Sequence, residues 1–210
     1  RDVERSRGLG DVYKRQKERN LVEYLDIKKA GNPNAYNRKP FSKTEVKKIW
    51  DVKDSNIYYT VILMLLYTGC RIGELLDLKK ENVNLEERYF KIVASKTAAG
   101  IRTAPISEKV YPFFEYWYNL NDCEYLLSTP EGEHFKYRNY YDSYWSPLIE
   151  TLGMKHRPHD TRHTCISMLA VAGVSDKVIK KIVGHKGQGV TEVVYTHFEI
   201  EELIDAINKI

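Results

Sequence analysis

The sequence predicts a mainly helical α+β domain that contains a small antiparallel β-sheet or hairpin. Residues 57–67 are apolar nearly all round, which is typical of a helix buried at the centre of a domain. Residues 83–106 change to the period of strands, with a turn between them. Residues 199–209 place isoleucine and leucine on one side of a helix, which predicts an amphipathic terminal helix.

Length and composition allow one substantial domain and a tail in 210 residues. The sequence has no run of about 18 apolar residues and no signal-peptide pattern at its start, so we expect no membrane span. The cysteines Cys70, Cys123 and Cys165 are odd in number and far apart, which argues against a disulfide framework or a cysteine-rich zinc site. This composition fits a protein of the reducing cytoplasm.

The charge is unevenly spread along the chain. Residues 1–40 hold 11 of the 33 Lys and Arg residues but only 6 of the 29 Asp and Glu residues. Residues 30–40 are rich in Asn and Pro, which is typical of a linker. We expect residues 1–40 to be a tail, the remnant of an upstream domain and its linker, and residues 41–210 to be the main domain. Net charge says little about what that domain binds.

The elements of the main domain follow from caps and periodicity. Ser42 and Glu45 have the spacing of a capping box, which predicts a helix directly after them. Gly69 predicts the C-terminal cap of the central helix. Arg71 then begins a short helix, with Glu74 one turn on. The other expected elements are strands at 89–93 and 101–106, helices at 107–120 and 136–152, a helix from Pro158 to Gly173, a helix capped by Ser175 and stopped by Gly184, and the terminal helix 199–209.

Arg71 and Lys96 each allow two interpretations. Arg71 is either a surface arginine paired with Glu74, or an arginine that Glu74 holds so that its fork binds two phosphate oxygens. Lys96 stands in the predicted hairpin turn, where a lysine is usually solvated. Its functional interpretation is an ammonium that reaches a leaving oxygen and acts as a general acid.

His159, Arg162 and His163 stand at positions i, i+3 and i+4 of a predicted helix. The spacing of the two histidines also allows a metal pair, as in a metal-dependent hydrolase. However, a fixed arginine cation beside both imidazoles opposes a bound dication, and no third ligand stands at a diagnostic spacing. We therefore favour phosphate binding over a metal, and we expect His163 to be a structural histidine.

Tyr195 and His185 say little when taken alone, because Tyr195 is one of 16 tyrosines and His185 simply follows Gly184. A free tyrosine has a pKa of about 10 and needs nearby cations to become a nucleophile. The two arginines, the lysine and the histidines above would supply them. They would also stabilise the charge of a pentavalent phosphate.

Five short segments are informative together: Thr68-Gly69-Cys70-Arg71-Ile72-Gly73-Glu74-Leu75; Ser95-Lys96-Thr97 followed by Arg102-Thr103-Ala104-Pro105-Ile106; His159-Asp160-Thr161-Arg162-His163-Thr164; Val183-Gly184-His185; and Tyr195-Thr196-His197. In this order and spacing, over roughly residues 32–210, they resemble the catalytic domain of the tyrosine recombinases, also called phage-type integrases.

The resemblance implies cleavage and rejoining of DNA through a 3′-phosphotyrosyl bond, with no metal, ATP or other cofactor. The roles that it implies are nucleophile for Tyr195, binding of non-bridging oxygens for Arg71 and Arg162, protonation of the leaving 5′-oxygen for Lys96, proton transfer and phosphate binding for His159 and His185, and orientation of the arginine for Glu74. The family usually adds a core-binding domain that closes round DNA, of which at most the last helix would remain here.

The resemblance also implies partners. These are double-stranded DNA attachment sites, accessory proteins that bend the DNA, and three further copies in a homotetramer built by exchange of helix 199–209. Packing of that helix on its own domain is the alternative. Thr97, Arg102 and Lys186 are guesses for DNA contacts, and the two cations are otherwise ordinary solvated side chains. The runner-up functions are type IB topoisomerase-like relaxation and a non-catalytic DNA-binding module.

Overall fold

The computed structural model describes residues 39–94, 100–185 and 199–210, which lie in one compact unit. The expected tail and linker up to residue 38 and the segments 95–99 and 186–198 lie outside the described residues. The division into residues 1–40 and 41–210 therefore stays a prediction.

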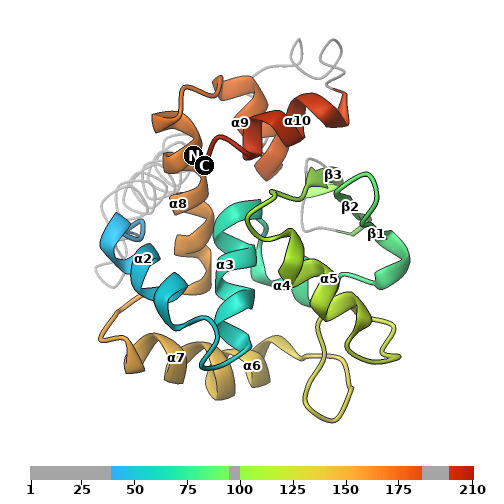
Figure 1. The fold of residues 1–210 in the computed structure, drawn as a ribbon, viewed down its shortest axis with the longest axis vertical. Coiled ribbons are helices and arrows are strands. Elements are labelled where there is room, and N and C mark those ends of the chain that lie inside the picture. The colour runs from blue at the N-terminus through green and yellow to red at the C-terminus, as the bar shows by residue number, and fades with distance from the viewer. Residues whose placement is uncertain (1–38, 95–99, 186–198) are drawn as a thin grey trace, which may run out of the picture. The chain divides into compact units, whose positions relative to one another are not determined.

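Helix α3, Tyr58–Thr68, is the centre of the domain, and every one of its residues is buried. Helix α8, Pro158–Val171, packs along it, and α2, Lys43–Val52, and α5, Tyr111–Asn119, contact it as well (Figure 1). Fully burying a leucine or isoleucine side chain stabilises a fold by roughly 1.5–3 kcal/mol. The run of apolar residues that predicted a buried helix thus forms the core on which the other helices pack.

The first helix of the unit, α2, begins as its sequence predicts. The backbone N–H of Glu45 donates to Ser42 Oγ at 3.3 Å, and the N–H of Ser42 donates to Glu45 Oε2 at 2.7 Å. Both bonds of the capping box are present, which satisfies two amide groups that the first helical turn leaves without partners.

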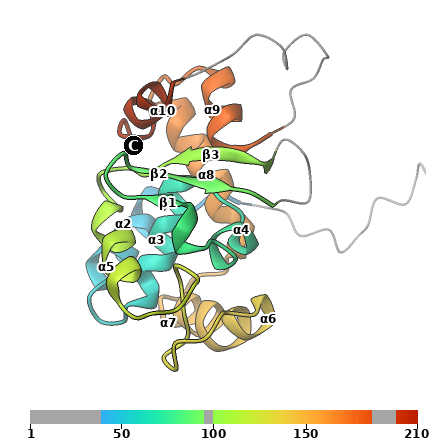
Figure 2. The ribbon, with the colours of Figure 1, turned by 90° about the vertical axis from the view of Figure 1, so that its right-hand side faces the viewer.

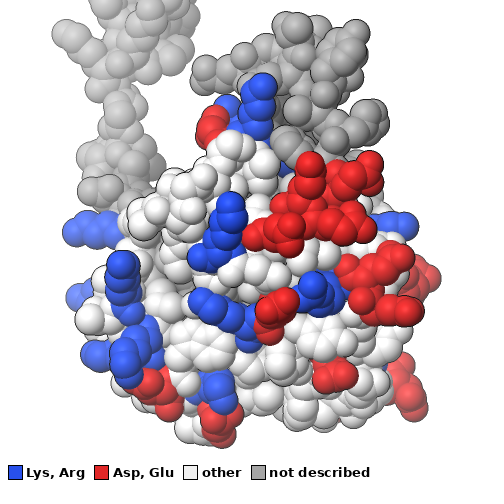
Figure 3. Space-filling view, turned by 45° about the horizontal axis from the view of Figure 1, so that its top comes forward, with Lys and Arg blue, Asp and Glu red and all other residues white. Residues whose placement is uncertain are grey.

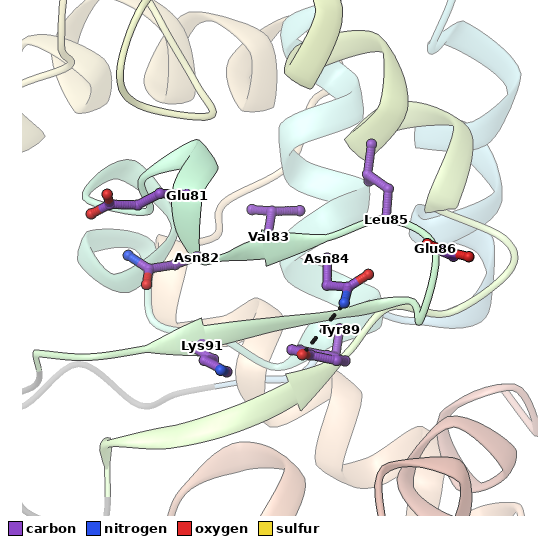
Figure 4. A pocket seen from close by; sticks show the side chains of 8 residues that line it. All are labelled: Glu81, Asn82, Val83, Asn84, Leu85, Glu86, Tyr89 and Lys91. Carbon is purple, nitrogen blue, oxygen red and sulfur yellow. Dashed lines mark hydrogen bonds between the residues drawn. The ribbon is translucent and has the colours of Figure 1, made fainter.

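The sheet has three antiparallel strands in the order β1-β2-β3: Val83–Asn84, Tyr89–Ile92 and Arg102–Pro105. Ile92 pairs with Arg102 and Phe90 with Ala104, so the expected hairpin is present. Strand β1 was not predicted, because two residues are too few to show alternation. A hollow beside β1 and β2 (Figure 4) is lined by Glu81, Asn82, Val83, Asn84, Leu85, Glu86, Tyr89 and Lys91. None of the candidate site residues in the described ranges lines it.

The single helix expected at 136–152 is instead three segments: α6, Tyr137–Tyr140; the π-helix η3, Tyr141–Trp145; and α7, Ser146–Thr151. The N–H of Ser146 donates to the carbonyl of Tyr141, five residues earlier. Pro147 follows and has no N–H, so the α-helical bond to residue 143 cannot form there. Tyr140 and Trp145 of these segments are fully buried.

Two short helices connect α3 to the sheet: α4, Ile72–Leu76, and the 3₁₀ helix η1, Lys80–Asn82. Helix α9, Asp176–Val183, follows α8 and ends at Gly184, whose φ of 71° is the left-handed conformation that glycine adopts without strain. Within the described ranges, every helix falls short of the length and apolar character that crossing a bilayer requires.

The terminal helix α10, Ile200–Ile207, packs on β3 and α9 of its own domain (Figure 2). It buries Leu203, Ile204, Ala206 and Ile207, and its C-cap Asn208 accepts a bond from the N–H of Glu108 at 2.9 Å. Its opposite side carries the exposed acids Glu201, Glu202 and Asp205, and Figure 3 shows acidic side chains gathered on this face. This charge repels anions, so the exposed face of α10 is unsuited to bind phosphate.

Candidate active site

The turn between α3 and α4 positions Arg71. Gly69 has a φ of 64°, and a Cβ built there would lie 2.8 Å from Val183 Cγ1 and 3.1 Å from Cys165 Sγ. Only glycine allows this turn to lie against both α8 and α9. The chain then leaves the turn in an extended conformation at Arg71, which is the N-cap of α4.

Glu74 holds Arg71 in place. Its Oε2 accepts the backbone N–H of Arg71 at 3.1 Å, and its Oε1 forms an ion pair with the Arg71 Nη1. The Arg71 side chain is nevertheless 29% exposed. A guanidinium fork that a carboxylate holds in place and that stays partly exposed is suited to bind an anion.

Arg162 lies on α8 and is fully buried. Its Nη1 donates to the carbonyl of Gly69 at 2.9 Å, and its Nη2 donates to the carbonyl of Gly184 at 3.5 Å. Among the described residues, its Nε–H has no acceptor. Burial and the neighbouring cations Arg71 and Arg102 lower the pKa of Arg162 to about 10, so the group stays charged at neutral pH. The arginine therefore ties both glycine turns to α8.

The side chain of Arg102 is buried, which the sequence did not predict. The sequence predicted either a contact with DNA or an ordinary solvated side chain. The second alternative is wrong, because the side chain is only 2% exposed, and the first stays a prediction. Its Nε donates to Ile182 O at 2.7 Å, and its Nη1 donates to Gly100 O at 2.8 Å. Arg102 shares one face of its strand with Ala104 and Ile106, which are both buried. This alternation was the signal in the sequence that could have identified it as an inward-facing residue.

Glu74 lies between two arginines, because its Oε2 also accepts from Arg102 Nη2 at 3.2 Å. Burial of the carboxyl works to raise its pKa, but Arg102 and Arg71 outweigh that effect and hold the pKa below its ordinary value. The carboxylate therefore stays ionised in a site where cations outnumber it.

The histidines border this cluster. His185 directly follows the Gly184 cap and is exposed at its edge. Partial burial, together with Arg162, Arg71 and His163, lowers the pKa of His185, so the neutral imidazole is favoured. His159 and His163 meet edge to face on α8, with ring centroids 5.1 Å apart. The part of the chain that the structure describes holds no group of three His, Cys, Asp or Glu side chains placed to bind a metal ion.

The structure thus gathers Arg71, Glu74, Arg102, Arg162 and His185 where α4, β3, α8 and the end of α9 meet (Figure 2). Tyr195, Lys96, Thr97 and Lys186 lie outside the described residues. For these four residues the expected positions stay predictions.

Comparison with known proteins matches this arrangement to one family. The phage integrase family matches residues 39–202 of the chain, which is most of its length. The chain belongs to this family. The resemblance that the five segments suggested is confirmed.

Curated relatives of this phage integrase family member include tyrosine recombinases. Tyrosine recombinase XerA of Pyrococcus horikoshii is 31% identical over 191 residues, which cover 88% of this chain and 66% of the relative. A XerC-like tyrosine recombinase of Caldanaerobacter subterraneus is 26% identical, with 81% of this chain and 53% of the relative covered. The chain therefore spans about half to two thirds of the length of these relatives.

Solved structures share the fold. The Tn1549 transposon integrase in complex with circular intermediate DNA has a TM-score of 0.64 at 21% identity, covering 81% of this chain and 64% of that one. XerA recombinase gives a TM-score of 0.61 at 23% identity, with coverage of 83% and 64%. A lambda integrase tetramer bound to a Holliday junction gives 0.59 at 17% identity, with coverage of 78% and 50%. The predicted helical fold with a small antiparallel sheet is confirmed.

Proposed function

We propose that this integrase-family chain is the catalytic part of a site-specific DNA recombinase, which cleaves and rejoins DNA for the integration or excision of a mobile element. One observation carries the proposal. Arg71 and Arg162 come from elements far apart in the sequence, yet both are fixed around the Gly69 turn by acceptors within the domain. Two fixed guanidinium groups suit the non-bridging oxygens of one phosphodiester.

In the proposed reaction, the Tyr195 oxygen attacks the phosphorus and forms an O–P bond at the 3′ end of the cut strand. The bond from phosphorus to the 5′-oxygen breaks, and Lys96 gives that oxygen its proton. Rejoining runs the same steps in reverse with a 5′-hydroxyl from either strand. The phosphotyrosine keeps the energy of the original bond, so the proposal requires neither ATP nor a divalent metal.

We assign the remaining proton transfer and phosphate contacts to the histidines. His185, favoured as a neutral imidazole beside Arg162, is suited to hydrogen-bond a phosphate oxygen or to exchange a proton with Tyr195. His159 lies on the same helix as Arg162 and takes a supporting role. Both assignments follow the family's pattern at these positions, as do those of Tyr195 and Lys96.

Covalent trapping tests the proposal. A parent protein incubated in EDTA with nicked duplex DNA from its element's ends should give an SDS-resistant protein–DNA band. Tyr195→Phe should abolish the band while noncovalent binding persists, and the exposed Tyr116→Phe is the matched control. Tight binding without any band in the wild type favours the DNA-binding module. Strand cleavage that requires added metal and leaves no covalent band favours a hydrolase built on His159 and His163.

Strand exchange separates recombination from the topoisomerase-like alternative. A recombinase joins the cut strand to a second DNA molecule, whereas a topoisomerase-like enzyme relaxes supercoils and rejoins the original ends. Two attachment-site duplexes of different length should therefore yield recombinant strands. Relaxation with no recombinant product would favour the runner-up.

The proposed partners are double-stranded attachment sites, accessory DNA-bending proteins and further copies of the chain, in the cytoplasm where the DNA lies. Lambda integrase, which shares the fold, is a tetramer when bound to a Holliday junction, and this supports a tetramer here. We place its assembly in the exchange of α10. In the single chain α10 packs on its own domain, and the same apolar face suits the equivalent surface of a neighbour.

Paired cysteines test this exchange of α10. Glu108 and Asn208 are hydrogen-bonded within one chain, so oxidation of a Glu108→Cys, Asn208→Cys protein without DNA should cross-link within a chain. Covalent oligomers should form on DNA if α10 is exchanged, and the wild type and each single substitution, which keep the native Cys70, Cys123 and Cys165, are the controls. Only intrachain cross-links in the presence of attachment-site DNA would contradict the exchange.

A further inference from the structure

Arg102 is the one cation of the described site to which the proposed chemistry gives no role. It is buried, and it reaches three elements: Glu74 on α4, Ile182 at the end of α9, and Gly100 before its own strand. On the basis of the proposed function, we infer that Arg102 is a positioning residue that locks the Glu74 carboxylate against Arg71 and fixes the end of α9 beside His185.

The geometry of the guanidinium supports a lock between elements. Each of its three nitrogens donates to a different acceptor, at 2.7 Å, 2.8 Å and 3.2 Å. Arg102 stands on β3, whose backbone is fixed by pairing with β2. A planar fork on a paired strand loses little further freedom when it binds, so it can hold two helix ends in register.

The first target, Glu74, depends on Arg102 electrostatically. Its side chain is 4% exposed, and an ionised carboxylate at that depth is stable only beside cations. Arg102 is the largest influence that favours the ionised form, ahead of Arg71. Other titratable groups facing this cluster are Arg162 on α8 and the buried Cys70 thiol, whose pKa is raised by burial.

The second target is the C-terminal end of α9. The carbonyl of Ile182 belongs to the last turn of that helix, where carbonyl groups lack helical partners and carry partial negative charge. Arg102 donates to this carbonyl, and Arg162 donates to that of Gly184. The two arginines together hold the backbone that leads into His185.

Loss of Arg102 should make DNA cleavage more sensitive to acid. In Arg102→Met, Glu74 stays buried but loses its main cation, so its pKa rises toward neutrality. Once the pH falls below that raised pKa, the neutral carboxyl no longer holds Arg71 by charge. DNA cleavage by the variant should therefore fail first at low pH and recover as the pH rises.

Single-turnover cleavage of nicked DNA, measured from pH 6 to pH 9, tests the inference. The deficit of Arg102→Met relative to wild type should be at least about tenfold greater at pH 6 than at pH 9, which requires the raised pKa of Glu74 in the variant to lie about one unit above pH 6. In a Glu74→Gln background, the pH-dependent part of the deficit should disappear. Arg102→Lys keeps the charge but loses the fork, so its deficit should be uniform with pH.

Controls separate positioning from simple folding. Arg88→Met removes an arginine in the turn between β1 and β2 whose partner Glu108 is exposed, and it should leave the profile unchanged. Noncovalent DNA binding by Arg102→Met should stay within about twofold of wild type, because Arg102 does not face solvent. A deficit that is equal at every pH and equal in both backgrounds would overturn the inference, as would no deficit at all.

A titration of the Glu74 carboxyl by ¹³C NMR is independent of catalysis. Its pKa should rise in Arg102→Met and stay near the wild-type value in Arg102→Lys. An unchanged pKa in Arg102→Met would contradict the lock. If wild-type protein forms no covalent product, the proposed function fails, and this titration alone decides whether Arg102 holds Glu74.

Discussion

Arg71 and Arg162 share one proposed task but are held by different kinds of acceptor. Arg71 is partly exposed and is held by the charge of Glu74, whereas Arg162 is buried and is held by the carbonyls of two glycine turns. The position of Arg71 therefore depends on an ionisation state, and the position of Arg162 depends on backbone shape. One phosphate site thus has a side that is sensitive to pH and a side that is sensitive to turn geometry.

The largest effects should come from the arginines themselves. Arg71→Met and Arg162→Met should each lower the single-turnover cleavage rate by about 10²–10³-fold, as expected when one donor to a charged transition state is lost. They should differ in stability. Arg162→Met leaves the carbonyls of Gly69 and Gly184 buried without a donor, which costs roughly 1–3 kcal/mol for each unsatisfied group.

Denaturant unfolding of the two variants measures that difference. Arg71→Met should unfold nearer to the wild-type midpoint, because Glu74 keeps its ion pair with Arg102. Equal destabilisation by the two variants would remove the distinction between an arginine held by charge and one held by backbone.

The next effect concerns the turn that Arg162 holds. Gly69→Ala adds a Cβ at 2.8 Å from Val183 Cγ1 in a left-handed residue, whereas Gly173→Ala adds one in a left-handed residue with no atom within 4 Å. Both variants bear the left-handed strain of about 1–2 kcal/mol. Gly69→Ala should lose a further 1–3 kcal/mol or so from overpacking, and should also slow cleavage.

Thermal unfolding and the cleavage assay, applied to both glycine variants, measure this pair. Cleavage by Gly173→Ala should stay close to wild type, because its turn lies away from the arginines. If Gly69→Ala matched Gly173→Ala in both assays, the close approach of the turn to α9 would contribute nothing to stability or to the cleavage rate.

The smallest effect concerns Glu74 and acid. Because its pKa is lowered in the folded protein, Glu74 contributes stability that is present above its ordinary pKa of 4.5 and is lost as the pH falls through the lowered value. Glu74→Gln should be less stable than wild type at pH 7, by about 1–3 kcal/mol for a hydrogen bond to a charged group. The gap should narrow as the pH falls below 4.5, as urea unfolding at several pH values will measure.

Much of the fold was predictable because its signals are local. The Ser42 capping box, the glycine cap at Gly69 and the wholly apolar α3 each need only a few neighbouring residues to be recognised. The match of Arg71 with Glu74 is also local, since the two stand three residues apart. These features survive folding because tertiary contacts reinforce them.

The features that sequence reasoning missed depend on distant contacts. The partner of β1 lies across the sheet, and the π-helical η3 depends on where aromatic residues such as Trp145 pack and on a following proline. Arg102 was missed because charge suggests exposure, while its acceptors Glu74 and Ile182 are 28 and 80 residues away in the sequence. Only the alternation of inward and outward side chains along its strand indicated that Arg102 faces the interior.

Removal of one phosphate charge from the DNA tests whether both arginines act on that charge. A DNA substrate with a methylphosphonate at the cleaved position lacks one charged oxygen, so it needs less cationic stabilisation than ordinary DNA. Cleavage rates of wild type, Arg71→Ala and Arg162→Ala should be measured on both substrates. We predict that each variant loses at least about tenfold less rate on methylphosphonate than on phosphate, a difference worth about 1.4 kcal/mol. Equal losses on the two substrates would contradict the claim that these arginines bind the non-bridging oxygens.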